Sequence, residues 1–216
     1  MKLAIFDLDN TLIGGDSDCL WGDFLTEKGY IDSDAYKKGH ERFYEQYTDG
    51  TLDIYEFLEF QLKVLGENDR QTLNAWRENY IEEKIKPIVL PKAVELVEEH
   101  RSKGHKLLII TATNEFITEP IAKLYNIKEL VACIPEIIDG EYTGKVTGIP
   151  SFAEGKVTRF NEWLENHEQV EESWFYSDSH NDIPLLKEVD HAIAVDADEK
   201  LIQEAKIENW PVISLR

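Results

Sequence analysis

Cysteine is scarce in this chain, and its two cysteines do not form a recognisable pair. Cys19 and Cys133 lie far apart in the sequence and make no Cys-X-X-Cys motif. Disulfide-stabilised secreted domains and thiol redox proteins both need paired cysteines at short or regular spacing. We therefore interpret both residues as small buried side chains.

Long apolar runs are also missing. No segment approaches the roughly 20 apolar residues that a membrane-spanning helix requires. The apolar run near the N-terminus, residues 3–6, is too short for a signal peptide. We therefore expect a soluble, cytoplasmic protein that does not act at a membrane.

Positive charge is in short supply. The chain has 23 Lys and Arg against 43 Asp and Glu, which gives a formal net charge of −20. A surface of this sign repels nucleic acid and anionic membranes, so neither is an expected partner. It also repels anionic substrates, so a phosphate-binding site would need a local cation.

Apolar and aromatic residues are plentiful, at 42% and 11% of 216 residues, and predict a globular fold. A buried strand is predicted at residues 3–6. Over residues 17–84 the apolar residues recur at helical spacing with no strand-like alternation. We therefore predict a helical cap domain over residues 14–87, inserted into a core domain made of residues 1–13 and 88–216.

Strands alternate with helices in the rest of the chain. We predict strands at 106–110, 173–176, 192–195 and 211–214, helices at 92–103, 115–125, 155–166, 183–187 and 198–206, and a hairpin with an Asp-Gly turn at 137–142. This alternation favours an α/β fold with a doubly wound parallel sheet.

Carboxylates and hydroxyls follow three of the predicted strands. Asp7 and Asp9 come after the first strand, Thr111 and its neighbours up to Asn114 after the second, and residues 178–182 after the third. Ligands of open α/β sheets bind beyond the carboxyl ends of the strands. These side chains are therefore expected at one rim of the sheet.

This residue set is suited to phosphoryl transfer. A carboxylate is ionised at neutral pH and can attack phosphorus, so one of Asp7 and Asp9 can act as nucleophile and the other as general acid and base. Several carboxylates and a phosphate dianion need cations, which points to Mg²⁺ held by Asp7, a main-chain carbonyl near Asp9, and Asp178. Lys156 would supply further positive charge.

Each of these residues also has an ordinary structural explanation. The Asp7 and Asp9 pair fits a turn after a strand, Thr111 a helix N-cap, and Lys156 a solvated helix position. The acidic residues of the 178–182 loop fit helix caps. Their order at successive strand ends favours a shared site over separate structural roles.

In combination, residues 7–12, Thr111, Lys156 and the segment 178–182 resemble the four motifs of the haloacid dehalogenase superfamily. The helical insert resembles the cap of its phosphoserine-phosphatase-like branch, which includes histidinol phosphatases. The resemblance implies that Asp7 is the nucleophile and Asp9 the acid/base. It further implies that Thr111 binds the phosphoryl group, that Lys156 neutralises it, that Asp178 ligates Mg²⁺, and that Asp182 supports the metal. The predicted metal-binding residues are therefore Asp7, Asp9, Asp178 and Asp182.

Three other functions match part of this residue pattern. A phosphate-signalling receiver domain also uses acidic residues, Thr and Lys, but it lacks a helical insert of this length. A phosphotransferase or mutase would share the Asp7 chemistry, and a catalytically dead binding module would not keep the full set of carboxylates. We expect hydrolysis of a small phosphorylated metabolite; the oligomeric state is not predicted.

The substrate prediction depends on residues of the cap. By resemblance to phosphoserine phosphatases, Asp16 would contact a substrate amine, although it also fits a helix cap, and Asn114 is a second substrate-binding candidate. The Arg that grips the serine carboxylate in those enzymes is replaced by Gln61, with Glu59 nearby. We therefore predict an amino-alcohol phosphate without a carboxylate, histidinol phosphate first. Phosphoserine is the alternative if Arg42 or Arg77 replaces the missing Arg.

Overall fold

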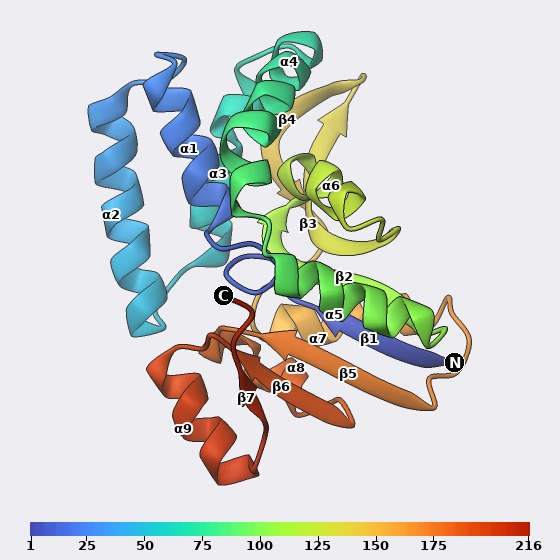
Figure 1. Ribbon diagram of the computed structural model, residues 1–216. Helices are drawn as coiled ribbons and strands as arrows, with labels where there is room; N and C mark the ends of the chain where they lie inside the picture. The colour runs from blue at the N-terminus through green and yellow to red at the C-terminus, as the bar shows by residue number, and fades with distance from the viewer.

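The computed structural model describes all 216 residues as a seven-stranded sheet with helices on both faces (Figure 1). The strand order is β4-β3-β2-β1-β5-β6-β7, and every neighbouring pair is parallel except β3 and β4. The strands are β1 (Lys2–Phe6), β2 (Lys106–Asn114), β3 (Glu129–Ile138), β4 (Glu141–Thr147), β5 (Glu172–Ser177), β6 (His191–Val195) and β7 (Val212–Ile213). The predicted doubly wound α/β fold is confirmed.

Side-chain alternation on the central strand separates two hydrophobic layers. Leu3 and Ile5 of β1 face one layer and Ala4 and Phe6 face the other, because successive side chains of a strand point to opposite faces. The helices of the first layer are α7 (Glu154–Leu164), α8 (Ile183–Leu186) and α9 (Glu199–Glu208). Those of the second are α5 (Pro91–Ser102) and α6 (Glu115–Leu124), together with part of the helical insert. Both faces of the sheet are therefore covered.

The segment between β1 and α5 contains helices joined by turns and no β-strand; Ile13 forms only an isolated bridge with Val89. It contains α1 (Ser17–Glu27), α2 (Ser33–Asp49), α3 (Ile54–Gly66) and α4 (Arg70–Tyr80), followed by a π-helical turn (Ile81–Ile85) and a 3₁₀ turn (Lys86–Ile88). Asp16, Asp32, Asp53 and Asp69 cap the four α-helices with their side chains, as expected for residues that satisfy free N–H groups. Where the insert leaves the core, Gly14 N donates to Ile88 O at 2.8 Å. The entering and leaving chain segments are thus tied together.

The insert shares its hydrophobic core with the sheet. One cluster of 31 buried residues runs from β1 and β2 through α5 and α6 into α1, α3 and α4. Helix α2 is the exception, because Phe43 is its only buried residue and the helix forms the outer edge of the insert (Figure 1). The division into a core of residues 1–13 and 88–216 and a cap of residues 14–87 stays a prediction.

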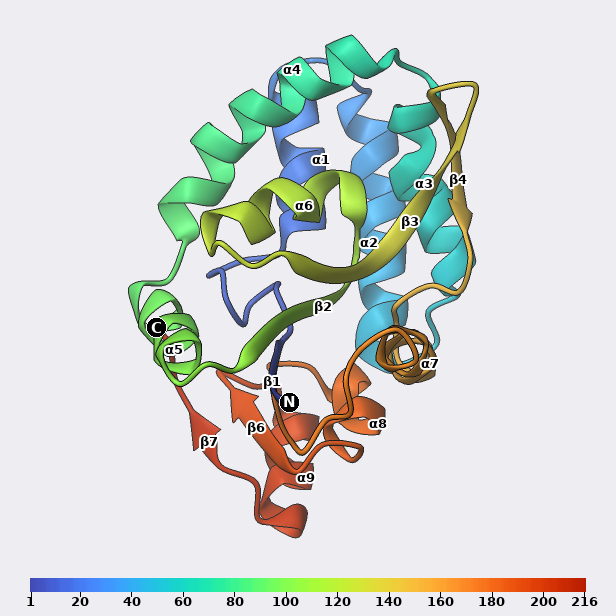
Figure 2. The ribbon, with the colours of Figure 1, turned by 90° about the vertical axis from the view of Figure 1, so that its right-hand side faces the viewer.

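The β3–β4 hairpin runs along α3, as Figure 2 shows. The contact is close because both elements present glycine. A Cβ added at Gly66 would lie 2.8 Å from Gly144 N, which is nearer than real Cβ atoms approach other groups. Gly144 also has a φ of +79°, where residues with a side chain are strained. Side chains at either position would push the helix and the hairpin apart.

Most of the predicted elements are present, and three differ. β2 continues to Asn114 instead of ending at 110, the hairpin is part of two longer strands, and the helical stretch ends in a π-helical turn. Both cysteines are free, with Cys133 buried and Cys19 partly buried. None of the helices is both long enough and apolar enough to span a membrane.

Candidate active site

The predicted site residues meet at the carboxyl ends of β1, β2 and β5, beneath the insert. A cavity of about 300 Å³ lies there. The core contributes Asp7, Asp9, Thr111, Lys156, Asp178 and Asp182 to its lining. The insert contributes mainly acidic and aromatic side chains. The cavity therefore has a core side and an insert side with different chemistry.

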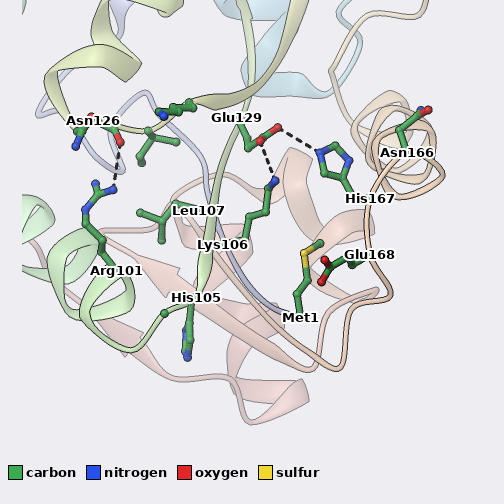
Figure 3. A pocket seen from close by; sticks show the side chains of 13 residues that line it. Met1, Arg101, His105, Lys106, Leu107, Asn126, Glu129, Asn166, His167 and Glu168 are labelled. Atoms are coloured by element: carbon green, nitrogen blue, oxygen red, sulfur yellow. Dashed lines mark hydrogen bonds and ion pairs between the residues drawn. The ribbon is translucent and has the colours of Figure 1, made fainter.

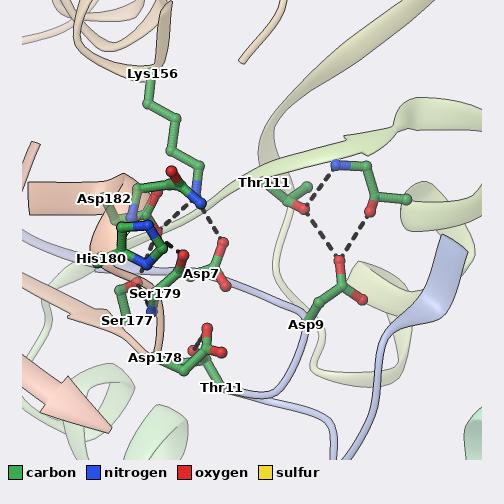
Figure 4. A network of polar contacts seen from close by, with 12 residues as sticks. Asp7, Asp9, Thr11, Thr111, Lys156, Ser177, Asp178, Ser179, His180 and Asp182 are labelled. Carbon is green, nitrogen blue, oxygen red and sulfur yellow. Dashed lines mark hydrogen bonds and ion pairs between the residues drawn. The ribbon is translucent and has the colours of Figure 1, made fainter. Parts of the chain in front are cut away.

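A buried ion cluster forms the centre of the core side (Figure 4). Lys156 Nζ donates to Asp7 Oδ1 and to Asp182 Oδ2, each at 2.7 Å, and Ser177 Oγ donates to the same Asp182 oxygen at 2.6 Å. The lysine is only 3% exposed. Burial lowers the pKa of Lys156, but Asp182 and Asp7 outweigh burial and raise it above its ordinary value. Lys156 is therefore a permanent cation beside Asp7.

Asp7 follows directly after β1, and its main-chain N–H donates to Tyr176 O at 2.9 Å, which continues the sheet pairing. Burial raises the pKa of Asp7 to about 7, although the Lys156 ammonium lowers it; Asp182 and Asp9 add to the rise. One lysine thus does not fully offset burial and the neighbouring carboxylates together. A second cation would keep Asp7 ionised at neutral pH.

Asp9 is held by the insert and by β2 instead of the ion cluster. Ser17 N donates to Asp9 Oδ1 at 2.7 Å, and Thr113 Oγ1 donates to Oδ2 at 2.9 Å. Thr111 Oγ1 is 3.5 Å from the same Oδ2. Burial is the main cause that raises the pKa of Asp9 to about 6. A carboxyl group near this pKa can both donate and accept a proton around neutral pH.

Asp178 completes the acidic rim. It accepts one side-chain hydrogen bond, from Thr11 Oγ1 at 3.3 Å. Burial, followed by the charges of Asp7 and Asp182, raises its pKa well above the ordinary value. No three His, Cys, Asp or Glu side chains are arranged as a ready metal cluster, since the carboxylates of Asp9 and Asp182 are directed to other partners. Asp7 and Asp178 remain as carboxylates that a hard cation would suit, because each is destabilised by its acidic neighbours.

The two predicted substrate-binding residues lie in different places. Asp16 lines the cavity and also caps α1, because its Oδ1 accepts from Cys19 N at 2.8 Å. Asn114 does not line the cavity. Its side chain caps α6 by accepting from Ile117 N at 3.3 Å, and it donates to Asp18 at 3.3 Å. The structure brings Asp16 to the site but not Asn114.

Arginine is absent from the cavity lining. Arg42 pairs with Glu56 at 2.8 Å on the outer side of the insert, and Arg77 donates to Phe116 O at 2.8 Å. Gln61 is buried and lies outside the lining. Lys156, on the core side, is the only Lys or Arg among the lining residues. The insert side therefore offers no fixed cation to a substrate.

Several lining residues were not predicted as functional from the sequence. Five aromatic side chains face the cavity: Phe43, Tyr44, Tyr47, Phe57 and Phe152. Tyr47 also meets the core, where its Oη lies 2.8 Å from Ser179 Oγ. The signal for most of them was the apolar stripe on α2, which is typical of a helix that packs against a core. Thr113 and Asp18 had no signal of their own.

A wider hollow of about 780 Å³ lies at the opposite end of the sheet, at the amino ends of β1, β2 and β3 (Figure 3). Several of its charged groups are already held by neighbouring protein groups. Lys106 is 2.9 Å and His167 is 3.4 Å from Glu129, and Arg101 donates to Asn126 O. None of the predicted site residues lies there.

Comparison with known proteins gives the family. A model of haloacid dehalogenase-like hydrolases matches residues 4–187. A histidinol-phosphatase of Neisseria meningitidis serogroup C (strain 8013) is 41% identical over 220 residues, which cover 100% of this chain and 99% of the relative.

Two solved structures have the same fold over the whole chain. A protein of unknown function from Bordetella pertussis Tohama I has a TM-score of 0.93 at 40% identity, covering 100% of this chain and 99% of that one. A phosphoserine phosphatase, solved as a phospho-aspartyl intermediate analogue, has a TM-score of 0.68 at 19% identity, covering 100% and 93%. Because the family model spans most of the chain and the Neisseria relative matches it from end to end, the chain belongs to the haloacid dehalogenase-like hydrolase family and is a phosphatase.

Proposed function

We propose that this phosphatase is a Mg²⁺-dependent phosphomonoester hydrolase that forms an aspartyl-phosphate intermediate and acts on a small amino-alcohol phosphate, with histidinol phosphate as the best candidate. One observation carries the substrate class. The cavity joins a lysine and carboxylate centre on the core side to an insert side that is acidic and aromatic and contains no arginine.

The reaction proceeds in two steps on the core side. Asp7 attacks phosphorus while the ester P–O bond breaks, and the Asp9 carboxyl group donates its proton to the departing alkoxide oxygen. The Asp9 carboxylate then takes a proton from water, which attacks the phosphorus of the acyl phosphate and regenerates Asp7. Lys156, 2.7 Å from Asp7, offsets the charge of the transferring phosphoryl group.

Ser17 and the threonines of β2 position Asp9 for these proton transfers. The hydrogen bonds from Ser17 N and Thr113 Oγ1 fix both carboxylate oxygens. Since Ser17 belongs to the insert and Thr113 to the core, Asp9 is in place only when the two parts are together. Thr111 Oγ1, whose distance to Asp9 is longer, is free to donate to a phosphoryl oxygen.

Magnesium would be held by Asp7, Asp178 and the main-chain carbonyl of Asp9, with Asp182 in the outer shell. All of these donors are oxygen atoms, which Mg²⁺ prefers. A bound cation would supply positive charge in addition to that of Lys156 and would withdraw electron density from the phosphoryl oxygens. The raised pKa values of Asp7 and Asp178 support this assignment, because a cation between them would favour both ionised forms.

The metal assignment predicts a specific defect in the Asp178→Asn variant. The amide keeps the shape of the side chain but carries no charge, so the Mg²⁺ concentration that gives half-maximal activity should rise at least tenfold. Titration of Mg²⁺ into chelator-treated enzyme measures this concentration. A wild-type enzyme that stays fully active in excess chelator would rule out the metal.

The insert side of the cavity favours a cationic, aromatic leaving group. Histidinol phosphate carries an amine and an imidazole ring and has no carboxylate. The aromatic side chains of the insert and Phe152 can contact the ring; Phe43 and Phe57 already pack edge to face with centroids 5.5 Å apart. Asp16 can accept the protonated amine. The 41% identical histidinol-phosphatase adds support from sequence.

A carboxylate on the substrate would find no lysine or arginine at this end of the cavity. Phosphoserine would place its carboxylate near Asp16 and Asp18 with no arginine to bind it. We therefore expect kcat/KM for histidinol phosphate to exceed that for phosphoserine by at least tenfold. Steady-state phosphate release with both substrates measures the ratio, and a higher value for phosphoserine would refute the substrate assignment.

The same assay separates hydrolysis from phosphotransfer. With histidinol phosphate as donor and excess ethanolamine as acceptor, a hydrolase releases one inorganic phosphate for each histidinol. A phosphotransferase would release less phosphate than histidinol and accumulate phosphoethanolamine.

A further inference from the structure

Asp18 is a buried carboxylate in the first turn of α1 that the reaction chemistry does not use. It is only 4% exposed and lines the insert side of the cavity next to Asp16. Asn114 Nδ2 donates to its Oδ1 at 3.3 Å, whereas its Oδ2 is buried and has no hydrogen-bond partner. No Lys, Arg or His forms an ion pair with it.

The surroundings of Asp18 make its negative charge unfavourable. Burial is the largest cause that raises its pKa well above the ordinary value, and the nearby charges of Asp16 and Asp9 add to it. The amide of Gln61 lowers the pKa, but Gln61 is neutral, and its Nε2 has no hydrogen-bond partner. Asp182 is buried to a similar degree, but Lys156 and Ser177 both donate to it, at 2.7 and 2.6 Å. Asp18 is thus a buried acid without a resident cation.

A buried carboxylate without a cation destabilises a fold unless something else requires it. An asparagine would fit the same volume and could still accept from Asn114. The unpartnered oxygen belongs to a residue of the cavity wall, so the missing cation can come from a ligand. The expected ligand cation is compact and able to donate hydrogen bonds, as a protonated primary amine is.

We propose that Asp18 is a specificity-determining residue that binds the protonated amine of the substrate together with Asp16, and so selects amine-bearing phosphates over neutral ones. This inference rests on the proposed function and deepens it. Asp16 is also the N-cap of α1, because its Oδ1 accepts a hydrogen bond from Cys19 N. Asp18 does not cap a helix, and its Oδ2 has no hydrogen-bond partner, so its carboxylate can turn toward an amine in the cavity.

The test compares matched pairs of phosphates in wild-type and Asp18→Asn enzymes. One pair is histidinol phosphate and its analogue without the amine; the other is phosphoethanolamine and ethyl phosphate. A hydrogen bond between charged groups contributes about 1.5–3 kcal/mol, so the amine-to-neutral ratio of kcat/KM should fall about 10- to 100-fold in the variant. Most of the loss should appear in KM, since the amine is remote from phosphorus.

Three further variants test whether the effect is specific to the carboxylates assigned to the amine. Asp23→Asn removes a charge from an exposed position of the same helix and should leave the ratio within twofold of wild type. Asp16→Asn keeps a capping side chain and should also lower the ratio. If both carboxylates hold one amine, the double variant Asp16→Asn with Asp18→Asn should lose less than the product of the two single losses.

Thermal stability without substrate distinguishes binding from a structural role. Removing an unpaired buried charge should leave the melting temperature of Asp18→Asn equal to or above that of wild type. A lower melting temperature together with an unchanged amine-to-neutral ratio would show that Asp18 only supports Asn114, and would overturn the inference.

These experiments distinguish failure of the Asp18 inference from failure of the proposed function. If wild type prefers phosphoserine to histidinol phosphate, the histidinol assignment fails, while the phosphoethanolamine pair still tests Asp18. If wild type prefers amines and Asp18→Asn keeps that preference, the inference fails and the proposed function stands. If wild type shows no amine preference in either pair, both fail.

Discussion

The Asp7→Asn variant is expected to lose phosphatase activity by roughly 10⁴-fold or more, because a neutral amide cannot attack phosphorus and no other carboxylate is directed to replace it. Asp9 is bound to Ser17 and Thr113, and Asp182 is bound to Lys156 and Ser177. The fold should survive, since the Lys156–Asp182 ion pair stays in place. Steady-state kcat measures the loss, and circular dichroism checks the fold.

Trapping of the intermediate gives an independent result for Asp7. Acid quenching of wild type with radiolabelled substrate should leave phosphate on the protein, and the Asp7→Asn protein should remain unlabelled. Asp139→Asn, at an exposed hairpin position, is the matched control and should be labelled like wild type. Activity of Asp7→Asn within tenfold of wild type would exclude the aspartyl-phosphate mechanism.

Replacing Lys156 should have the second-largest effect, on both stability and activity. In Lys156→Met the side chain keeps most of its length, but Asp7 and Asp182 are left buried without their cation. Breaking a buried ion pair in this way costs about 3–5 kcal/mol, and the loss of charge at the phosphoryl group should lower kcat by roughly 10³-fold. Urea denaturation and steady-state kinetics measure the two effects.

A double variant separates these two effects. Asp182→Asn added to Lys156→Met removes one of the stranded carboxylates and should recover part of the free energy of unfolding. It should not recover activity, because the cation beside Asp7 is still missing. A single variant as stable as wild type, or a double variant with restored activity, would show that Lys156 does not have the role assigned to it.

The fold was largely predictable because its strands are short, apolar and buried on both faces. Strands of this kind, such as β1 and β5, are continuous apolar runs, which distinguishes them from helices that have one apolar face. The hairpin was harder to predict. β3 contains Pro135 and polar residues and pairs irregularly with β4, so only its Asp-Gly turn was visible in the sequence.

The core side of the site was predictable for a related reason. Parallel strands bring their carboxyl ends to one rim, so residues that follow apolar runs meet there. The insert side was not predictable, since spacing does not reveal hydrogen-bond partners. Asn114 lies near the carboxyl end of β2 like Thr111, yet its side chain turns to cap α6. Asp18 looks in sequence like an ordinary acid in the first turn of a helix, and only its burial distinguishes it.

The glycine contact between α3 and the hairpin limits how this enzyme can be recombined with its relatives. Gly66 and Gly144 lie 78 positions apart in the chain but share one contact, so they have to be compatible with each other. An insert transplanted from a relative would also meet a hydrophobic cluster that spans both parts. The helical insert is therefore not an exchangeable cassette, and a working chimera would need residues 141–147 from the same donor as residues 54–66.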